Sequence, residues 1–213
     1  MAENTNTDNT GSTGRFKLPI PRAVLELHRF TNDGRASHPG IDRIRVTASE
    51  QVATNGHCLA QASFKLTPEL GTWGGDTAFY IPGELAKNIL VGAKRTDRFA
   101  LECTLPGPMH LVRYVPDGTK YHLAASFPIP LTADRPGWPD HSQVMKTPVR
   151  ETAKIGLDLG LLDLFRLYLK KAGNTSTRVV FSLAGENEPV TATITLESGL
   201  ADVVFVAMPW RMK

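Results

Sequence analysis

Residues 153–173 read AKIGLDLGLLDLFRLYLKKAG, and this stretch combines a strand pattern with a helix pattern. Leu157 and Leu159 are separated by one polar residue, as on one face of a strand. Apolar residues at helical spacing follow as a stripe, formed by Leu161, Leu164, Phe165 and Tyr168. Gly173 then stands where a glycine commonly ends a helix. The stretch predicts a short strand that leads directly into an amphipathic helix.

The same order of patterns occurs twice earlier in the chain. Residues 16–31, FKLPIPRAVLELHRFT, predict a strand over 16–20 and a short helix over 22–30, with Pro21 at the start of the helix. Residues 77–95, TAFYIPGELAKNILVGAKR, carry a β-rich run into a proline and then into helical spacing. Strand-like runs follow each helix, at 41–48 and 52–64, at 98–105, 109–114 and 120–126, and at 178–185, 190–197 and 201–213. Three β-α-β-β-β units of about sixty residues predict an internally repeated α+β protein.

The organisation between these units follows from composition. Residues 1–14 are mostly Asn, Thr and Gly, so no burial offsets the entropy of ordering them, and a disordered tail is expected. The first two units form one domain over 15–127, a Pro-rich connector covers 128–148, and the third unit forms a half-domain over 149–213.

Composition excludes several classes of protein. The 213 residues are 41% hydrophobic and 21% charged, as in an ordinary globular protein. No apolar run approaches the roughly 20 residues of a membrane span, and the N-terminus has no signal-peptide pattern, so a cytoplasmic protein without a membrane partner is expected. Cys58 and Cys103 lack the spacing of a zinc site or a disulfide framework, and a net charge of +3 is only weakly attractive to polyanions.

Catalytic patterns are absent from the sequence. It contains no GxSxG, GxxxxGK[ST], HExxH, EF-hand or GxGxxG motif in a suitable context, so neither an enzyme nor a cofactor or metal is expected. Asp140 and His141 are adjacent, but neighbouring side chains on an extended segment point apart. His57 has no nucleophile at a recognisable spacing, and a structural role is its simplest interpretation.

Three separated segments, in order, point to one known family. VATNGHCLA at 52–60 resembles the loop VATDGHRLA of the bacterial DNA polymerase III β subunit, the sliding clamp. GWPDHSQVM at 137–145 resembles that clamp's RFPDYRRVL, and VFVAMPWRM at 204–212 resembles its C-terminal YVVMPMRL. The resemblance covers residues 16–213 and implies the DNA-clamp fold, with helices on the inner face of a ring and sheets outside.

The resemblance also implies an unusual arrangement of domains. The first two units resemble the clamp's middle domain, and the third resembles the second half of its last domain. Because the family's ring contains twelve such units, a ring of three-unit chains would need four copies. Exposed sheet edges and an uncovered helix face would favour pairing with another chain, so a homo-oligomer is expected.

The resemblance implies a pocket that binds short linear motifs of partner proteins. Its wall here would be Thr54, Gly56, His57, Leu59, Pro139, Val144, Val206, Met208, Pro209, Trp210, Arg211 and Met212. Cys58 and Gln143 replace arginines of the family, which weakens polar contacts to a peptide, and Trp210 replaces a methionine. Without the resemblance, the alternation of Met208, Trp210 and Met212 would indicate one face of a core strand.

The resemblance further implies contact between the helices and duplex DNA, without sequence specificity. The basic residues available for this are Arg22, Arg29, Lys87, Lys94, Arg95, Arg166, Lys170 and Lys171. Basic residues near helix C-termini also complement the helix dipole, which explains several of them equally well.

Two functions of different classes follow. The first is a shortened, nucleoid-associated processivity factor, which oligomerises around duplex DNA and tethers a polymerase, clamp loader or repair protein through the pocket. The alternative is an adaptor that binds clamp-binding peptides without encircling DNA. A repeat protein with a coincidental resemblance is the third possibility, and it requires three ordered matches to arise by chance.

Overall fold

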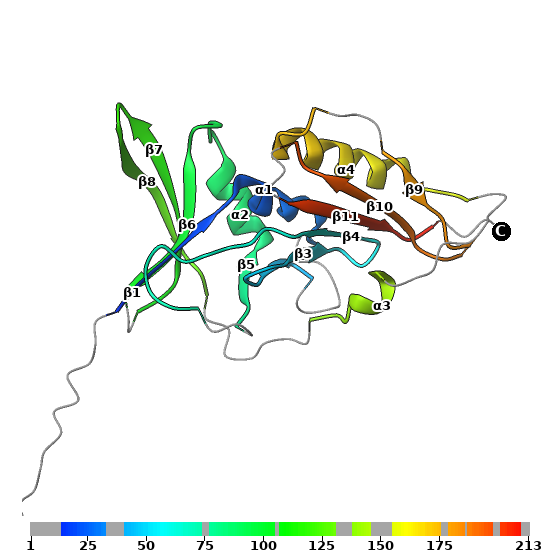
Figure 1. The fold of residues 1–213 in the computed structure, drawn as a ribbon, viewed down its shortest axis with the longest axis horizontal. Coiled ribbons are helices and arrows are strands. Elements are labelled where there is room, and N and C mark those ends of the chain that lie inside the picture. Colours follow the sequence, from blue (N-terminus) through cyan, green and yellow to red (C-terminus); the bar gives the residue numbers. More distant parts are fainter. Residues whose placement is uncertain are drawn as a thin grey trace, which may run out of the picture.

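The computed structural model describes residues 14–32, 41–73, 77–104, 107–130, 138–145, 155–175, 179–185, 187–197 and 201–209, without the side chains of Gln143 and Val144. These residues form two sheets and the helices that pack on them (Figure 1). The expected tail and much of the Pro-rich connector lie outside the described residues.

The first unit begins with an alternating strand, in which Phe16, Leu18 and Ile20 are buried. The helix expected over 22–30 is α-helical to Glu26 and continues as a 3-10 turn to Phe30. The elements of this unit are β1 (Arg15–Ile20), α1 (Arg22–Glu26), η1 (Leu27–Phe30), β2 (Arg43–Val46), β3 (Gln51–Thr54) and β4 (Cys58–Ala62).

The second unit repeats this order as β5 (Phe79–Pro82), α2 (Gly83–Leu90), β6 (Arg98–Thr104), β7 (His110–Asp117) and β8 (Lys120–Pro128). Gly83 begins α2 at a close approach of two segments, because a β-carbon there would overlap with the side chain of Thr31. Gly118 has a φ of 61° in the turn between β7 and β8, a conformation that glycine adopts without steric cost.

The third unit contains α4 (Leu159–Ala172), β9 (Phe181–Ser182), β10 (Val190–Thr195) and β11 (Asp202–Ala207), and the short α3 (Ser142–Met145) precedes it. The prediction of a strand at Leu157 and Leu159 is wrong, because Leu159 is the first residue of α4 and 155–158 form no strand. Asp158 caps α4 by accepting a hydrogen bond of 2.7 Å from the Gly160 amide, and Gly173 ends it with a φ of 94°. Phe165 and Tyr168 of the expected stripe are buried with Leu169. The stripe is therefore turned slightly from the expected one, and Leu161 and Leu164 are only half-buried.

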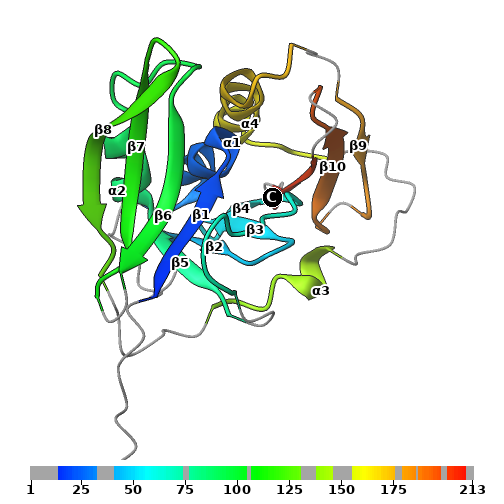
Figure 2. The ribbon, with the colours of Figure 1, turned by 60° about the vertical axis from the view of Figure 1, so that its left-hand side comes forward.

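The sheets connect the units through strand exchange. The four-stranded sheet has the order β1-β6-β7-β8, and the seven-stranded sheet has the order β5-β2-β3-β4-β11-β10-β9 (Figure 2). The first strand of each of the first two units thus pairs in the sheet of the other unit. The third unit adds to the first through antiparallel pairing of β4 with β11, in which Leu59 lies opposite Val206.

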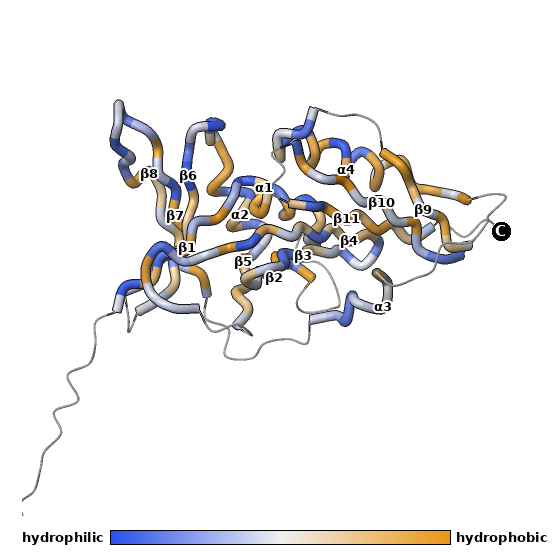
Figure 3. The backbone as a smooth tube through the Cα atoms, in the orientation of Figure 1, coloured by the Kyte–Doolittle hydropathy of each residue, from blue (hydrophilic) through white to orange (hydrophobic). Residues whose placement is uncertain are grey.

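The main core lies where α1, η1 and α4 meet the seven-stranded sheet, and β11 in that sheet is largely hydrophobic (Figure 3). Phe205 of β11 is fully buried, stacks on Phe165 at a centroid distance of 4.4 Å, and lies 5.9 Å from Phe30. Tyr168 completes the cluster with an edge contact to Phe30 at 5.6 Å. Since α1 also contacts both α2 and α4, side chains of the first and third units share one core. In the described part of the chain, no helix has the length and apolar character of a membrane span.

Candidate functional site

A second, smaller apolar cluster lies on the other face of the seven-stranded sheet. Val52 of β3, Leu59 of β4 and Val206 of β11 are buried there, apart from the main core. Their neighbours along the strands, such as Phe205, point to the opposite face because side chains alternate along a strand. Figure 1 shows α3 and α4 on opposite sides of this part of the sheet. The cluster therefore lies at the junction between the first and third units, on the face of the sheet that α4 does not cover. We call this face the outer face and the three residues the outer-face cluster.

The turn between β3 and β4 is fixed by short hydrogen bonds. The Thr54 hydroxyl donates to the Cys58 carbonyl at 2.8 Å and accepts from the Gly56 amide at 3.1 Å. The Asn55 side-chain oxygen accepts from the amides of His57 and Cys58, each at 2.9 Å. Gly56 has a φ of 88°, which favours glycine, so the sequence Thr-Asn-Gly specifies this turn locally.

The segment after β11 is attached to this turn. The Met208 amide donates to the His57 carbonyl at 3.0 Å, which continues the β4–β11 pairing by one step. Met208 is 44% exposed beside the buried Leu59 and Val206 pair. A flexible, polarisable thioether at the rim of an apolar cluster is suited to contact with an apolar ligand.

Cys58 begins β4 with its side chain on the core face of the sheet. Burial raises the pKa of its thiol to about 12, so the group is a neutral thiol at neutral pH. Its side chain therefore faces the main core and not the cluster of Val52, Leu59 and Val206, and it supplies no charge to that cluster.

Residues 138–145 cover one side of the outer cluster. Trp138 and Met145 pack against it, and the Trp138 ring lies 6.1 Å from the Tyr80 ring. The indole nitrogen of Trp138 is buried and has no hydrogen-bond partner among the described residues. Trp138 therefore contributes apolar surface to the cluster rather than a polar contact.

The adjacent Asp140 and His141 have separate partners. Asp140 accepts hydrogen bonds from the Ser142 amide at 3.0 Å and the Ser142 hydroxyl at 2.7 Å. His141 Nε2 lies 3.2 Å from Glu50 Oε1, the atom to which Arg45 donates at 2.8 Å. These contacts attach α3 to the β2–β3 hairpin. Among the described residues, no cluster of His, Cys, Asp and Glu could hold a metal ion.

The expected pocket residues fall into two groups. Those gathered at the junction are Thr54, Gly56, His57, Leu59, Val206 and Met208, with Pro209 following Met208 and Pro139 following Trp138. Trp210, Arg211, Met212 and the side chain of Val144 lie outside the described residues. The sequence analysis did not predict that Val52, Trp138 and Met145 contribute to this cluster. For Trp138 the sequence held one signal, because it is the one tryptophan in the 128–148 connector. The peptide-binding role of these residues stays a prediction.

Two of the residues expected to contact DNA are engaged within the fold. Glu26 is buried in α1, and its carboxylate accepts from Arg22 Nε at 3.2 Å and from Arg29 Nε at 3.1 Å. Arg22 also donates to the carbonyls of Ala93 and Lys94, each at 3.2 Å, and so attaches the α2–β6 loop to α1. Because these arginines neutralise a buried carboxylate, their attraction for a phosphate is reduced.

The remaining basic residues on the helices differ in their pairing. Lys87 lies 3.5 Å from Glu84, and Arg166 donates to Asp163 at 2.8 Å, both at exposed positions where such pairs are weak. Lys94, Arg95, Lys170 and Lys171 are exposed and have no acidic partner in the part of the chain that the structure describes.

His28 adds no charge to this group of helices at neutral pH. Burial, together with the nearby Arg29, lowers its pKa to about 4, so the imidazole is neutral there. His28 therefore does not add to the positive charge of Lys94, Arg95, Lys170 and Lys171.

The topology described above is found in solved structures. The H. pylori β clamp aligns with a TM-score of 0.60 and 10% identity over 94% of this chain and 67% of that one. Caulobacter crescentus pol III beta aligns with a TM-score of 0.52 and 15% identity over 99% of this chain and 70% of that one. The proliferating cellular nuclear antigen of Entamoeba histolytica aligns with a TM-score of 0.53 and 9% identity over 93% of this chain and 99% of that one. The chain has the sliding-clamp fold. The expected α+β clamp architecture is confirmed.

No family model and no curated protein sequence matches the chain. The chain spans about two thirds of the length of the bacterial clamps with which it aligns. Identities of 9–15% carry the fold and not the site residues.

Proposed function

We propose that this clamp-fold protein is a processivity factor that does no chemistry itself and tethers a partner protein to duplex DNA. The observation that carries the proposal is the outer-face cluster at the β4–β11 junction. There two distant segments of the chain place Leu59, Val206 and Met208 side by side. A linear motif with apolar side chains would bind against Met208 and the adjoining rim.

A pentapeptide of the Gln-x-x-Leu-Phe type is expected to bind at this junction. Met208→Ala should weaken the binding by about 1–2 kcal/mol, because it removes an accessible apolar contact without opening the core. Leu123→Ala is the matched control, since Leu123 is similarly exposed but lies on β8 in the other sheet. Titration calorimetry measures all three affinities. No detectable binding to the wild type, or equal losses in both variants, would contradict the assignment.

The proposal also requires that the helices contact duplex DNA. The double variant Lys87→Glu/Lys170→Glu should bind a 20-base-pair duplex more weakly and with a salt dependence reduced by about two charges. Lys120→Glu is the control, because it changes the net charge by the same amount as each single substitution but lies at the exposed start of β8, away from the helices. Fluorescence anisotropy across a salt series gives both quantities.

The adaptor remains the second candidate. Glu26 pairs with Arg22 and Arg29, so these two arginines contribute less positive potential toward DNA. The two functions differ in the duplex measurement. Unchanged DNA binding in the helix variant, together with normal peptide binding, would support the adaptor and exclude DNA contact through these helices. Assembly of several copies into a ring belongs to the processivity proposal alone.

A further inference from the structure

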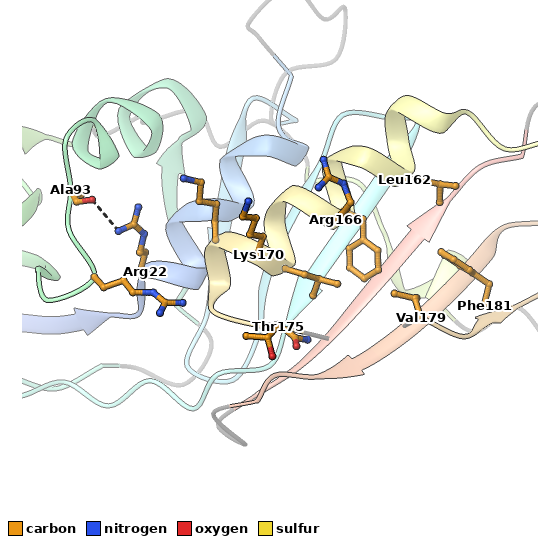
Figure 4. Close-up of a pocket in the computed structure, with 13 residues that line it drawn as sticks. Arg22, Ala93, Leu162, Arg166, Lys170, Thr175, Val179 and Phe181 are labelled. Atoms are coloured by element: carbon orange, nitrogen blue, oxygen red, sulfur yellow. Dashed lines mark hydrogen bonds between the residues drawn. The ribbon is translucent and has the colours of Figure 1, made fainter. Parts of the chain in front are cut away.

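A pocket of about 960 Å³ lies along α4, away from the outer-face cluster (Figure 4). Leu162, Arg166 and Lys170 of α4 form one side of it, and Val179 and Phe181 at the start of β9 form the opposite side. Its second end reaches Arg22 and the α2–β6 loop. The cations that line it are among the residues expected to contact DNA, but neither the sequence patterns nor the proposed function assigns a role to its apolar part between α4 and β9.

The floor of the pocket is apolar. Phe165 is buried at its base, where it stacks on Phe205 with an angle of 8° between the rings. Leu162, Val179 and Phe181 are only half-buried and border the open space. Apolar surface of this kind is stabilised when apolar side chains of a ligand cover it.

The rim of the pocket is positively charged. Its cations are Arg22, Arg95, Arg166, Lys170 and Lys171, and no Asp or Glu is among the described residues that line it. Because Arg22 pairs with Glu26 and Arg166 with Asp163, the excess charge comes from the other three. Arg95 crosses from the α2–β6 loop to the end of α4, where its guanidinium lies 3.9 Å from the position of a β-carbon on Gly173. Complementing the helix dipole needs fewer cations than Arg95, Lys170 and Lys171 together supply in one place. A ligand with several negative charges would compensate the excess.

We propose that this pocket binds an acidic amphipathic peptide segment of a partner protein. Apolar side chains of the segment cover Leu162 and Phe181, and its carboxylates pair with Lys170, Lys171 and Arg95. A second copy of the chain does not fit through the same face, because like charges would oppose one another. The bases of a single-stranded nucleic acid fit the floor less well, because one face of Phe165 is already occupied by Phe205 and the floor has no polar groups to match a base.

The direct test uses a synthetic twelve-residue peptide with Leu at every third or fourth position and Glu at most others. The matched control peptide carries Gln in place of each Glu. We expect the acidic peptide to bind at least tenfold more tightly than the Gln peptide in fluorescence anisotropy, with an affinity that falls as salt is raised. Equal affinity for the two peptides, or no binding of the acidic one, overturns the proposal.

Two variants locate the binding, and circular dichroism verifies that each is folded. Phe181→Ala and Lys170→Glu should each weaken the acidic peptide at least fivefold, whereas Lys120→Glu on β8 should leave its affinity unchanged. Binding that neither pocket variant weakens would overturn the assignment to this pocket.

A duplex of 20 base pairs separates this site from the proposed DNA contacts. Phe181→Ala should leave duplex affinity unchanged, because an apolar wall makes no contact with phosphates. A duplex that loses as much affinity as the peptide would show that the pocket binds nucleic acid instead. The inference goes beyond the proposed function. Lys170 belongs both to the pocket and to the proposed DNA contacts, whereas Phe181 belongs to the pocket alone, so Phe181→Ala distinguishes failure of one from failure of the other.

Discussion

Replacing Glu26 with alanine is expected to lower the free energy of unfolding by about 3–5 kcal/mol. The side chain of Glu26 is 2% exposed and compensates two arginines that are each 23% exposed. Its removal leaves Arg22 and Arg29 close together in a largely dehydrated site, without their shared acceptor. The loss should lie toward the lower end of the range, because the arginines keep some access to water. Urea denaturation followed by circular dichroism measures the difference.

Glu84→Ala is the matched control for this substitution. Glu84 also pairs with a cation of its own helix, Lys87, but its side chain is 71% exposed, so its loss should cost less than about 1 kcal/mol. Glu26→Gln should fall between the two, because the amide oxygen still accepts one hydrogen bond while the charge is lost. A Glu26→Ala variant as stable as Glu84→Ala would show that burial of this carboxylate contributes nothing to the fold.

The role of Glu26 also shows what the sequence predicts about the basic residues. Arg22 and Arg29 stand four and three residues from Glu26, which are the spacings at which side chains of a helix meet. The signal for an internal ion pair was therefore present in the sequence. The burial of Glu26 was not, because it results from the packing of α4 over α1, and no local pattern encodes a contact between such distant segments.

The same distinction separates the predicted and unpredicted parts of the fold. Alternation and helical spacing located β1, α1, α2 and α4, because these signals are local. The exchange of β1 and β5 between sheets and the pairing of β4 with β11 depend on strands far apart in sequence. The resemblance supplied the outer-face residues Leu59 and Val206. It did not supply Trp138 and Met145, whose contribution depends on how the connector folds back over the sheet.

The β4–β11 pairing raises the question whether the third unit is a separate folding unit. Its helix shares a core with the first unit through Phe165, Phe205 and Phe30, and its sheet is an extension of the first unit's sheet. Both connections are lost together if the third unit detaches. One cooperative unfolding transition is therefore expected for the first and third units.

Phe205→Ala tests this coupling and should cost about 3–5 kcal/mol. Phe205 is fully buried between Phe165 and Phe30, so truncation opens a cavity at the contact between the units. Phe181→Ala removes the same atoms from a half-buried position on the edge strand and should cost only about 1 kcal/mol. Urea denaturation monitored by both tryptophan fluorescence and circular dichroism should show a single shifted transition. Two separated transitions in Phe205→Ala would instead show that the third unit unfolds on its own, and that the shared sheet contributes less to the junction than the aromatic stack.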